Sequence, residues 1–97
     1  MKTTKKDFAL FKKECKYWIN KFGVNEGEFY FAHKKLENAN ALTRYNMRDR
    51  VFVIYFDIHI DDPKELDKTK DEWIQDIAKH EAIHILIGKL EHLGALR

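Results

Sequence analysis

Residues 77–90 read IAKHEAIHILIGKL, and the motif HEAIH within them places His80 and His84 on either side of Glu81. The surrounding aliphatic residues recur at helical spacing, which predicts a helix from about residue 70 to residue 88 or 93. Residues four apart on an α-helix differ by about 40° in direction and rise about 6 Å along the axis. The two imidazoles are therefore expected side by side, on a face predicted to be buried together with Trp73, Ile77 and Ile87.

A second helix is predicted near the N-terminus. Thr4 and Asp7 have the spacing of a capping box, in which each side chain satisfies a backbone amide of the first helical turn. Gly23 suits the left-handed residue that follows a helix, so the helix is expected over about residues 5–22. Its inward stripe is predicted to consist of Phe8, Phe11, Cys15, Trp18 and Phe22.

Three strands are predicted between the helices. Apolar and polar residues alternate over residues 28–35 and, more weakly, over 39–45, and residues 50–60 read RVFVIYFDIHI, which is rich in β-branched and aromatic side chains. We expect the three strands to pair in sequence order as a meander. The predicted fold class is α+β, with an N-terminal helix, a small three-stranded antiparallel sheet and a C-terminal helix that carries the HEAIH motif.

Composition indicates one domain over residues 1–97, because 97 residues with 44% hydrophobic content support a single modest core. The net charge of +2 does not by itself indicate a partner of opposite charge. Cys15 has no second cysteine to pair with, and the start of the chain lacks the pattern of a secretory signal, so we expect a reducing, cytoplasmic location. No apolar run approaches the ~18 residues that cross a bilayer, so we expect no membrane association.

The HEAIH motif predicts a metal site. Two imidazoles on one helix face can both bind one divalent ion at a distance of about 2 Å, and zinc is the ion expected. Glu81 points about 100° away from His80, beside the ion, where it can act as the general base on a metal-bound water. The alternative is a pair of hydrogen-bonded core histidines, because an unpaired buried imidazole costs roughly 1–3 kcal/mol.

The order of a strand, an acidic connection and a helix carrying His80, Glu81 and His84 resembles the zincin metallopeptidases. The short layout, with its lysine-rich aromatic first helix, is similar to SprT-like proteins and small putative phage metallopeptidases. The resemblance implies a minimal zincin-like domain and a zinc-dependent endopeptidase that hydrolyses protein or peptide substrates. It implies His80 and His84 as zinc ligands, Glu81 as the catalytic base, and residues 51–60 as a surface for an extended peptide.

A third zinc ligand is not specified by the motif. His92 can supply it if the helix ends or bends at Gly88, as a glycine does in the metzincins. Glu91 lies on the same helical face but some 10 Å away along a continuous helix. His59, on the long strand, and a residue from a neighbouring chain are further candidates.

Two other functions remain open at this point. A catalytically incomplete zincin-like protein could act by binding a partner, as small phage-encoded inhibitors do. The basic first helix, with seven lysines in residues 1–22, and the DNA-linked roles of SprT-like proteins suggest a nucleic-acid-associated module. The sequence specifies neither a substrate side chain nor an oligomeric state.

Overall fold

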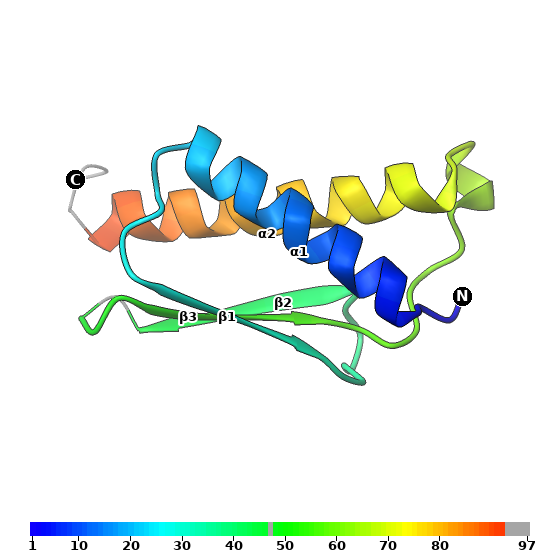
Figure 1. Ribbon diagram of the computed structural model, residues 1–97, viewed down its shortest axis with the longest axis horizontal. Helices are drawn as coiled ribbons and strands as arrows, with labels where there is room; N and C mark the ends of the chain where they lie inside the picture. The colour runs from blue at the N-terminus through cyan, green and yellow to red at the C-terminus, as the bar shows by residue number, and fades with distance from the viewer. Residues whose placement is uncertain (47, 93–97) are drawn as a thin grey trace.

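Two helices lie on one face of a three-stranded sheet (Figure 1). The computed structural model describes residues 1–46 and 48–92, except for the side chains of Glu65 and His92. Its elements, in chain order, are α1 (Lys5–Lys21), β1 (Glu28–His33), β2 (Ala41–Asn46), β3 (Val51–Phe56), a 3-10 helix η1 (Pro63–Leu66) and α2 (Lys70–His92). The predicted α+β class and the order of helices and strands are confirmed.

The sheet is mixed, so the predicted antiparallel meander is wrong. Its strand order is β1-β3-β2, in which β3 pairs parallel to β1 and antiparallel to β2. The physical reason is the composition of β3, whose inward residues Phe52, Ile54 and Phe56 are at most 1% exposed. The central position of a sheet buries such residues best, because a strand there has a neighbour on both sides. As a consequence, β2 is an edge strand, and residues 51–56 have no free edge on which an extended peptide could pair.

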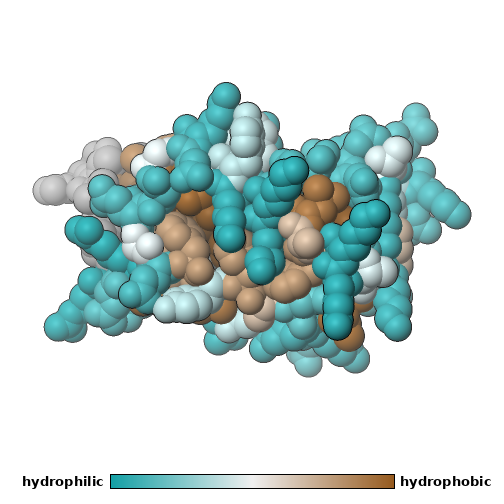
Figure 2. All heavy atoms as spheres, in the orientation of Figure 1, coloured by the Kyte–Doolittle hydropathy of each residue, from teal (hydrophilic) through white to brown (hydrophobic). Residues whose placement is uncertain are grey.

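Helix α1 begins with the predicted capping box. The Asp7 amide donates to Thr4 Oγ1 at 3.1 Å, and the Thr4 amide donates to the Asp7 carboxylate at 2.8 Å. Phe11 and Cys15 are fully buried as predicted, but Ile19 completes the buried face, whereas the predicted Phe8, Trp18 and Phe22 are only partly buried. Hydrophilic side chains cover most of the molecular face that carries α1, and apolar surface shows between them (Figure 2).

Helix α2 buries a different face from the one predicted. Its fully buried apolar residues are Ile74, Ala78, Ala82 and Ile85. The two alanines allow α1 to approach closely, and the Cys15 thiol donates to the Ala78 carbonyl oxygen at 3.7 Å. Of the predicted stripe, Ile77 is buried and Trp73 is partly buried, whereas His80 and His84 are exposed and Ile87 is 44% exposed. The prediction of buried histidines is therefore wrong.

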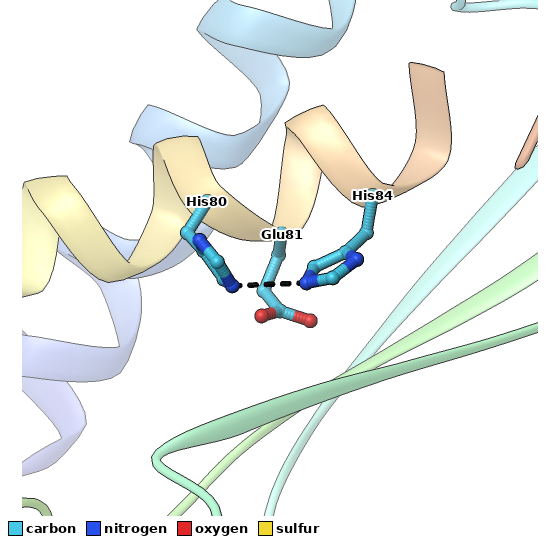
Figure 3. Close-up of side chains that lie close together, drawn as sticks. All are labelled: His80, Glu81 and His84. Atoms are coloured by element: carbon cyan, nitrogen blue, oxygen red, sulfur yellow. Dashed lines mark hydrogen bonds between the residues drawn. The ribbon is translucent and has the colours of Figure 1, made fainter. Parts of the chain in front are cut away.

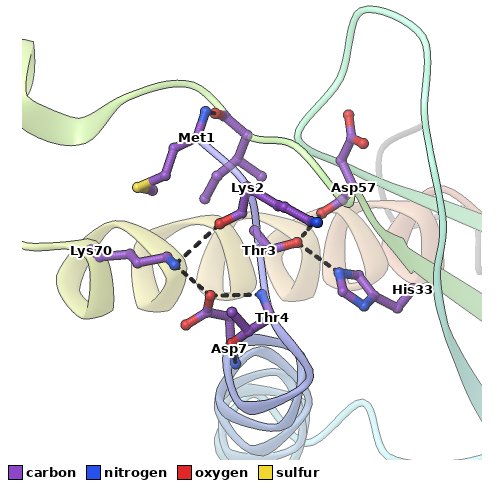
Figure 4. A network of polar contacts seen from close by, with 9 residues as sticks. Met1, Lys2, Thr3, Thr4, Asp7, His33, Asp57 and Lys70 are labelled. Atoms are coloured by element: carbon purple, nitrogen blue, oxygen red, sulfur yellow. Dashed lines mark hydrogen bonds and ion pairs between the residues drawn. The ribbon is translucent and has the colours of Figure 1, made fainter.

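A polar network joins the first residues of the chain to α1, α2 and the end of β3 (Figure 4). Thr3 Oγ1 donates to the Asp57 carbonyl oxygen at 2.7 Å and lies 2.6 Å from His33 Nε2. Lys70 Nζ pairs with the Asp7 carboxylate at 2.6 Å. Burial raises the pKa of Asp7, but its hydrogen bonds with Lys70 and Thr4 outweigh burial and hold the pKa below its ordinary value. Among the described residues, no helix is long and apolar enough to span a bilayer.

Candidate metal centre

His80, Glu81 and His84 form one cluster on the side of α2 that faces the sheet (Figure 3). The Nε2 atoms of the two imidazoles lie 2.9 Å apart and form a hydrogen bond, and the spacing of one helical turn predicts that the rings are neighbours. One potential ligand atom from each of the three residues lies within 4.8 Å of the others. The imidazoles are exposed, whereas Glu81 is only 5% exposed. The cluster thus combines two accessible nitrogen donors with one sheltered carboxylate.

The imidazole pair fits a zinc ion. Two Zn–N bonds of about 2.1 Å at a tetrahedral angle place the nitrogens about 3.4 Å apart, so a separation of 2.9 Å requires the rings to move by only about half an ångström. Because both rings are exposed, such a shift meets little packing resistance. Imidazole nitrogen is also a donor that zinc favours. His80 and His84 are therefore suitable as two ligands of a zinc site.

Thr43 holds the carboxylate of Glu81. The Thr43 hydroxyl, on the face of β2 that points toward the helices, donates to Glu81 Oε1 at 2.9 Å. This bond gives the buried carboxylate a partner, and no buried side-chain nitrogen or oxygen in the described part of the chain lacks one. Sequence reasoning missed Thr43, because the strand pattern does not indicate which side chain an inward threonine contacts. The contact fixes the carboxylate beside the imidazoles.

A groove of about 1190 Å³ lies between α2 and β2 and contains the cluster. The candidate ligand His59 also lines this groove, together with Asp57 and Asp61. His59, however, lies with its Nδ1 atom 3.2 Å from the Met1 amine, and its backbone amide donates to Asp57 Oδ1 at 3.1 Å. These residues share the groove but are not part of the His80–Glu81–His84 cluster.

The predicted third ligand His92 lies at the last described position of α2. The helix continues through Gly88 to His92, so the end or bend at Gly88 that would bring His92 back to the ion is not found. Eight residues of continuous helix separate His92 from His84 by about 12 Å along the axis. The side chain of His92 lies outside the described residues, and its role as a ligand stays a prediction. Glu91 lines the groove about 10 Å along the axis from His84.

Cys15 is not a candidate nucleophile. Its side chain is fully buried in the core, and burial raises the pKa of the thiol well above its ordinary value. Cys15 therefore packs as a small apolar residue on the inward stripe of α1.

The chain matches no protein-family model, no curated protein and no solved structure. The chemistry of the groove therefore rests on its own residues. Those residues are a pair of imidazoles, a buried carboxylate held by a hydroxyl, and an edge strand beside them.

Proposed function

We propose that the protein is a zinc-dependent metalloendopeptidase, in which His80 and His84 hold the ion and Glu81 is the general base. The observation that carries the proposal is the pair of Nε2 atoms 2.9 Å apart beside a buried, hydrogen-bonded carboxylate. The 2.9 Å contact is also a hydrogen bond between the two imidazoles, but the core-histidine alternative requires buried rings, and both imidazoles are exposed.

Each residue of the site has a separate role in the proposed reaction. Zinc, when bound, supplies a Lewis acid that polarises the peptide carbonyl and makes water more acidic. Glu81 takes the proton from the attacking water and transfers it to the departing amine nitrogen. Thr43 keeps the carboxylate of Glu81 pointed into the groove, because its hydroxyl occupies Oε1 and leaves Oε2 free for proton transfer.

The edge strand β2 supports binding of an extended peptide. Within the described residues only β3 pairs with β2, so the other edge of β2 keeps free backbone donors and acceptors beside the groove. An extended chain can add to such an edge through main-chain hydrogen bonds that do not depend on its sequence. We therefore assign peptide binding to β2 rather than to residues 51–60.

The test is the replacement of Glu81 by glutamine in the full chain. We expect Glu81→Gln to retain zinc and to lose cleavage of a denatured protein substrate by at least about a hundredfold, because glutamine cannot accept the proton. Glu14→Gln, on α1 and away from the groove, is the matched control and should cleave as the wild type does. Equal cleavage by Glu81→Gln, or a wild-type protein that binds no zinc, would overturn the proposal.

A second candidate is a catalytically incomplete zincin-like protein that binds a partner through the same groove. In the described residues, Glu81 is the one carboxylate grouped with the imidazole pair, and a site that used it as the third ligand would have no base. In that case Glu81→Gln would lower zinc affinity, and the wild type would bind peptide without cutting it. The nucleic-acid alternative stays a prediction, and salt-dependent retention on DNA would test it.

A further inference from the structure

Hydrogen bonds show which parts of β2 and α2 lie at each end of the groove. Near the start of β2, Asn40 Nδ2 donates to Asp61 Oδ2 at 3.3 Å, and Trp73 Nε1, in the first turns of α2, donates to the Asp61 carbonyl oxygen at 3.1 Å. Farther along both elements, Thr43 meets Glu81. Strand β2 and helix α2 therefore run in the same direction along the groove, and Tyr45 lies toward the C-terminal half of α2.

The end of the groove beside the C-terminal half of α2 is largely apolar. Tyr45 is 46% exposed and Ile87 is 44% exposed, and both line the groove, one from the strand and one from the helix. Gly88 and Glu91 line the same end, and Glu91 supplies one charge. Exposed apolar side chains that converge on a concave surface are typical of a ligand site, whereas scattered ones need no explanation.

The other end of the groove is acidic. Asp57, Asp61 and Asp76 line it, together with His59 and Lys68. Lys68 forms an ion pair with Asp76, so the charge of this lysine is already matched by one carboxylate. Asp57 is only 6% exposed and accepts a hydrogen bond from the His59 amide, so the exposed carboxylate in excess is that of Asp61. A concave surface with an excess of one sign concentrates ligands of the other sign.

We propose that the groove selects extended peptides with a lysine or arginine at the Asp61–Asp76 end and a bulky apolar residue at the Tyr45–Ile87 end. The imidazole pair lies between the two ends, so the bond to be cut lies between the two selected side chains. From Asp76 to Ile87 the helix rises about 16 Å, which an extended peptide spans in about five residues. Cleavage of such peptides depends on the proposed peptidase function, whereas their binding does not.

Four fluorescent peptides test the proposal. Each has either lysine or glutamate at one position and either leucine or serine about five residues away. Their affinities are measured by fluorescence anisotropy with the metal-free wild-type protein, and their cleavage by mass spectrometry after addition of zinc. We expect the lysine–leucine peptide to bind about tenfold more tightly than either singly changed peptide. Equal binding of all four peptides would overturn the proposal.

Paired variants assign each preference to its end of the groove. Ile87→Ser should remove the preference for leucine, whereas Leu90→Ser, which changes a 38% exposed residue of α2 that does not line the groove, should keep it. Asp76→Asn releases Lys68 from its ion pair and should remove the preference for lysine, whereas Asp71→Asn, exposed on α2 outside the groove, should keep it. Circular dichroism checks that each variant is folded.

The outcomes separate this proposal from the proposed peptidase function. Selective binding with no cleavage would support the inference about the groove and contradict the peptidase. Cleavage without selection, or preferences that Ile87→Ser and Asp76→Asn leave intact, would contradict the inference and leave the peptidase standing.

Discussion

Replacing Thr43 with valine should destabilise the protein measurably, although the change exchanges one hydroxyl for one methyl group. The hydroxyl donates to Glu81 Oε1 at 2.9 Å, and Glu81 is 5% exposed, so water can replace this donor only in part. Valine has nearly the same shape as threonine and fits the same position in β2. The loss of stability in Thr43→Val therefore reports mainly on the hydrogen bond.

The expected magnitude follows from the charge of the acceptor. A hydrogen bond to a charged group contributes about 1.5–3 kcal/mol, so Thr43→Val should lower the free energy of unfolding by about that amount near pH 7. Urea unfolding followed by circular dichroism measures this change, with the slope of the transition checked for constancy. Thr43→Ser is the matched control, because it keeps the donor and loses only a methyl group, at a cost of about 1 kcal/mol or less. A Thr43→Val protein as stable as the wild type would refute the role assigned to this contact.

Three further predictions concern the fold. Gly27→Ala should lower the free energy of unfolding in urea by more than about 2 kcal/mol, because a Cβ atom at Gly27 would overlap the Arg50 carbonyl oxygen. Gly23→Ala is the matched control and should lower it by only about 1 kcal/mol, because a Cβ atom there meets nothing within 4 Å. Asp7→Asn should lower the free energy of unfolding by about 1–2 kcal/mol near pH 7. Because folding lowers the pKa of Asp7, the extra stability of the wild type over Asp7→Asn is present above the unfolded pKa and should be lost as pH falls through the folded pKa. The difference in free energy of unfolding between the two proteins should therefore be clear in unfolding curves near pH 7 and small near pH 2. Cys15 should resist iodoacetamide in the folded protein, because burial raises its pKa, and should react fully once urea unfolds the chain; rapid labelling of the native state, seen by mass spectrometry, would contradict its buried position.

Local features of the fold could be predicted from the sequence, whereas the pairing of the strands could not. The capping box of Thr4 and Asp7 and the alternation within Val51–Phe56 depend on neighbouring residues, and both are found. The order β1-β3-β2 depends on which strand buries its apolar face best, and that competition involves the whole domain. Strand candidates that follow one another in sequence need not pair, so a meander was the simplest prediction and was wrong.

The candidate site, too, could be predicted only where its geometry depends on neighbouring residues in the sequence. The side-by-side placement of His80 and His84 follows from the helical period and is present in the structure. The face that α2 buries was mispredicted because Ala78 and Ala82 count little in a hydrophobic pattern, yet they are the residues that let α1 approach. Thr43 was missed because its hydrogen bond joins positions 38 residues apart, a relation that no local pattern contains.

Zinc binding by the full chain tests the central claim most directly. Titration against a chromophoric chelator measures affinity and stoichiometry, and we predict one zinc ion per chain for the wild type. His84→Ala should bind at least about a hundredfold more weakly, whereas His59→Ala, which changes a groove histidine outside the cluster, should bind as the wild type does. A wild-type chain that binds no zinc, or a His84→Ala chain that binds it equally well, would contradict the assignment of the metal centre.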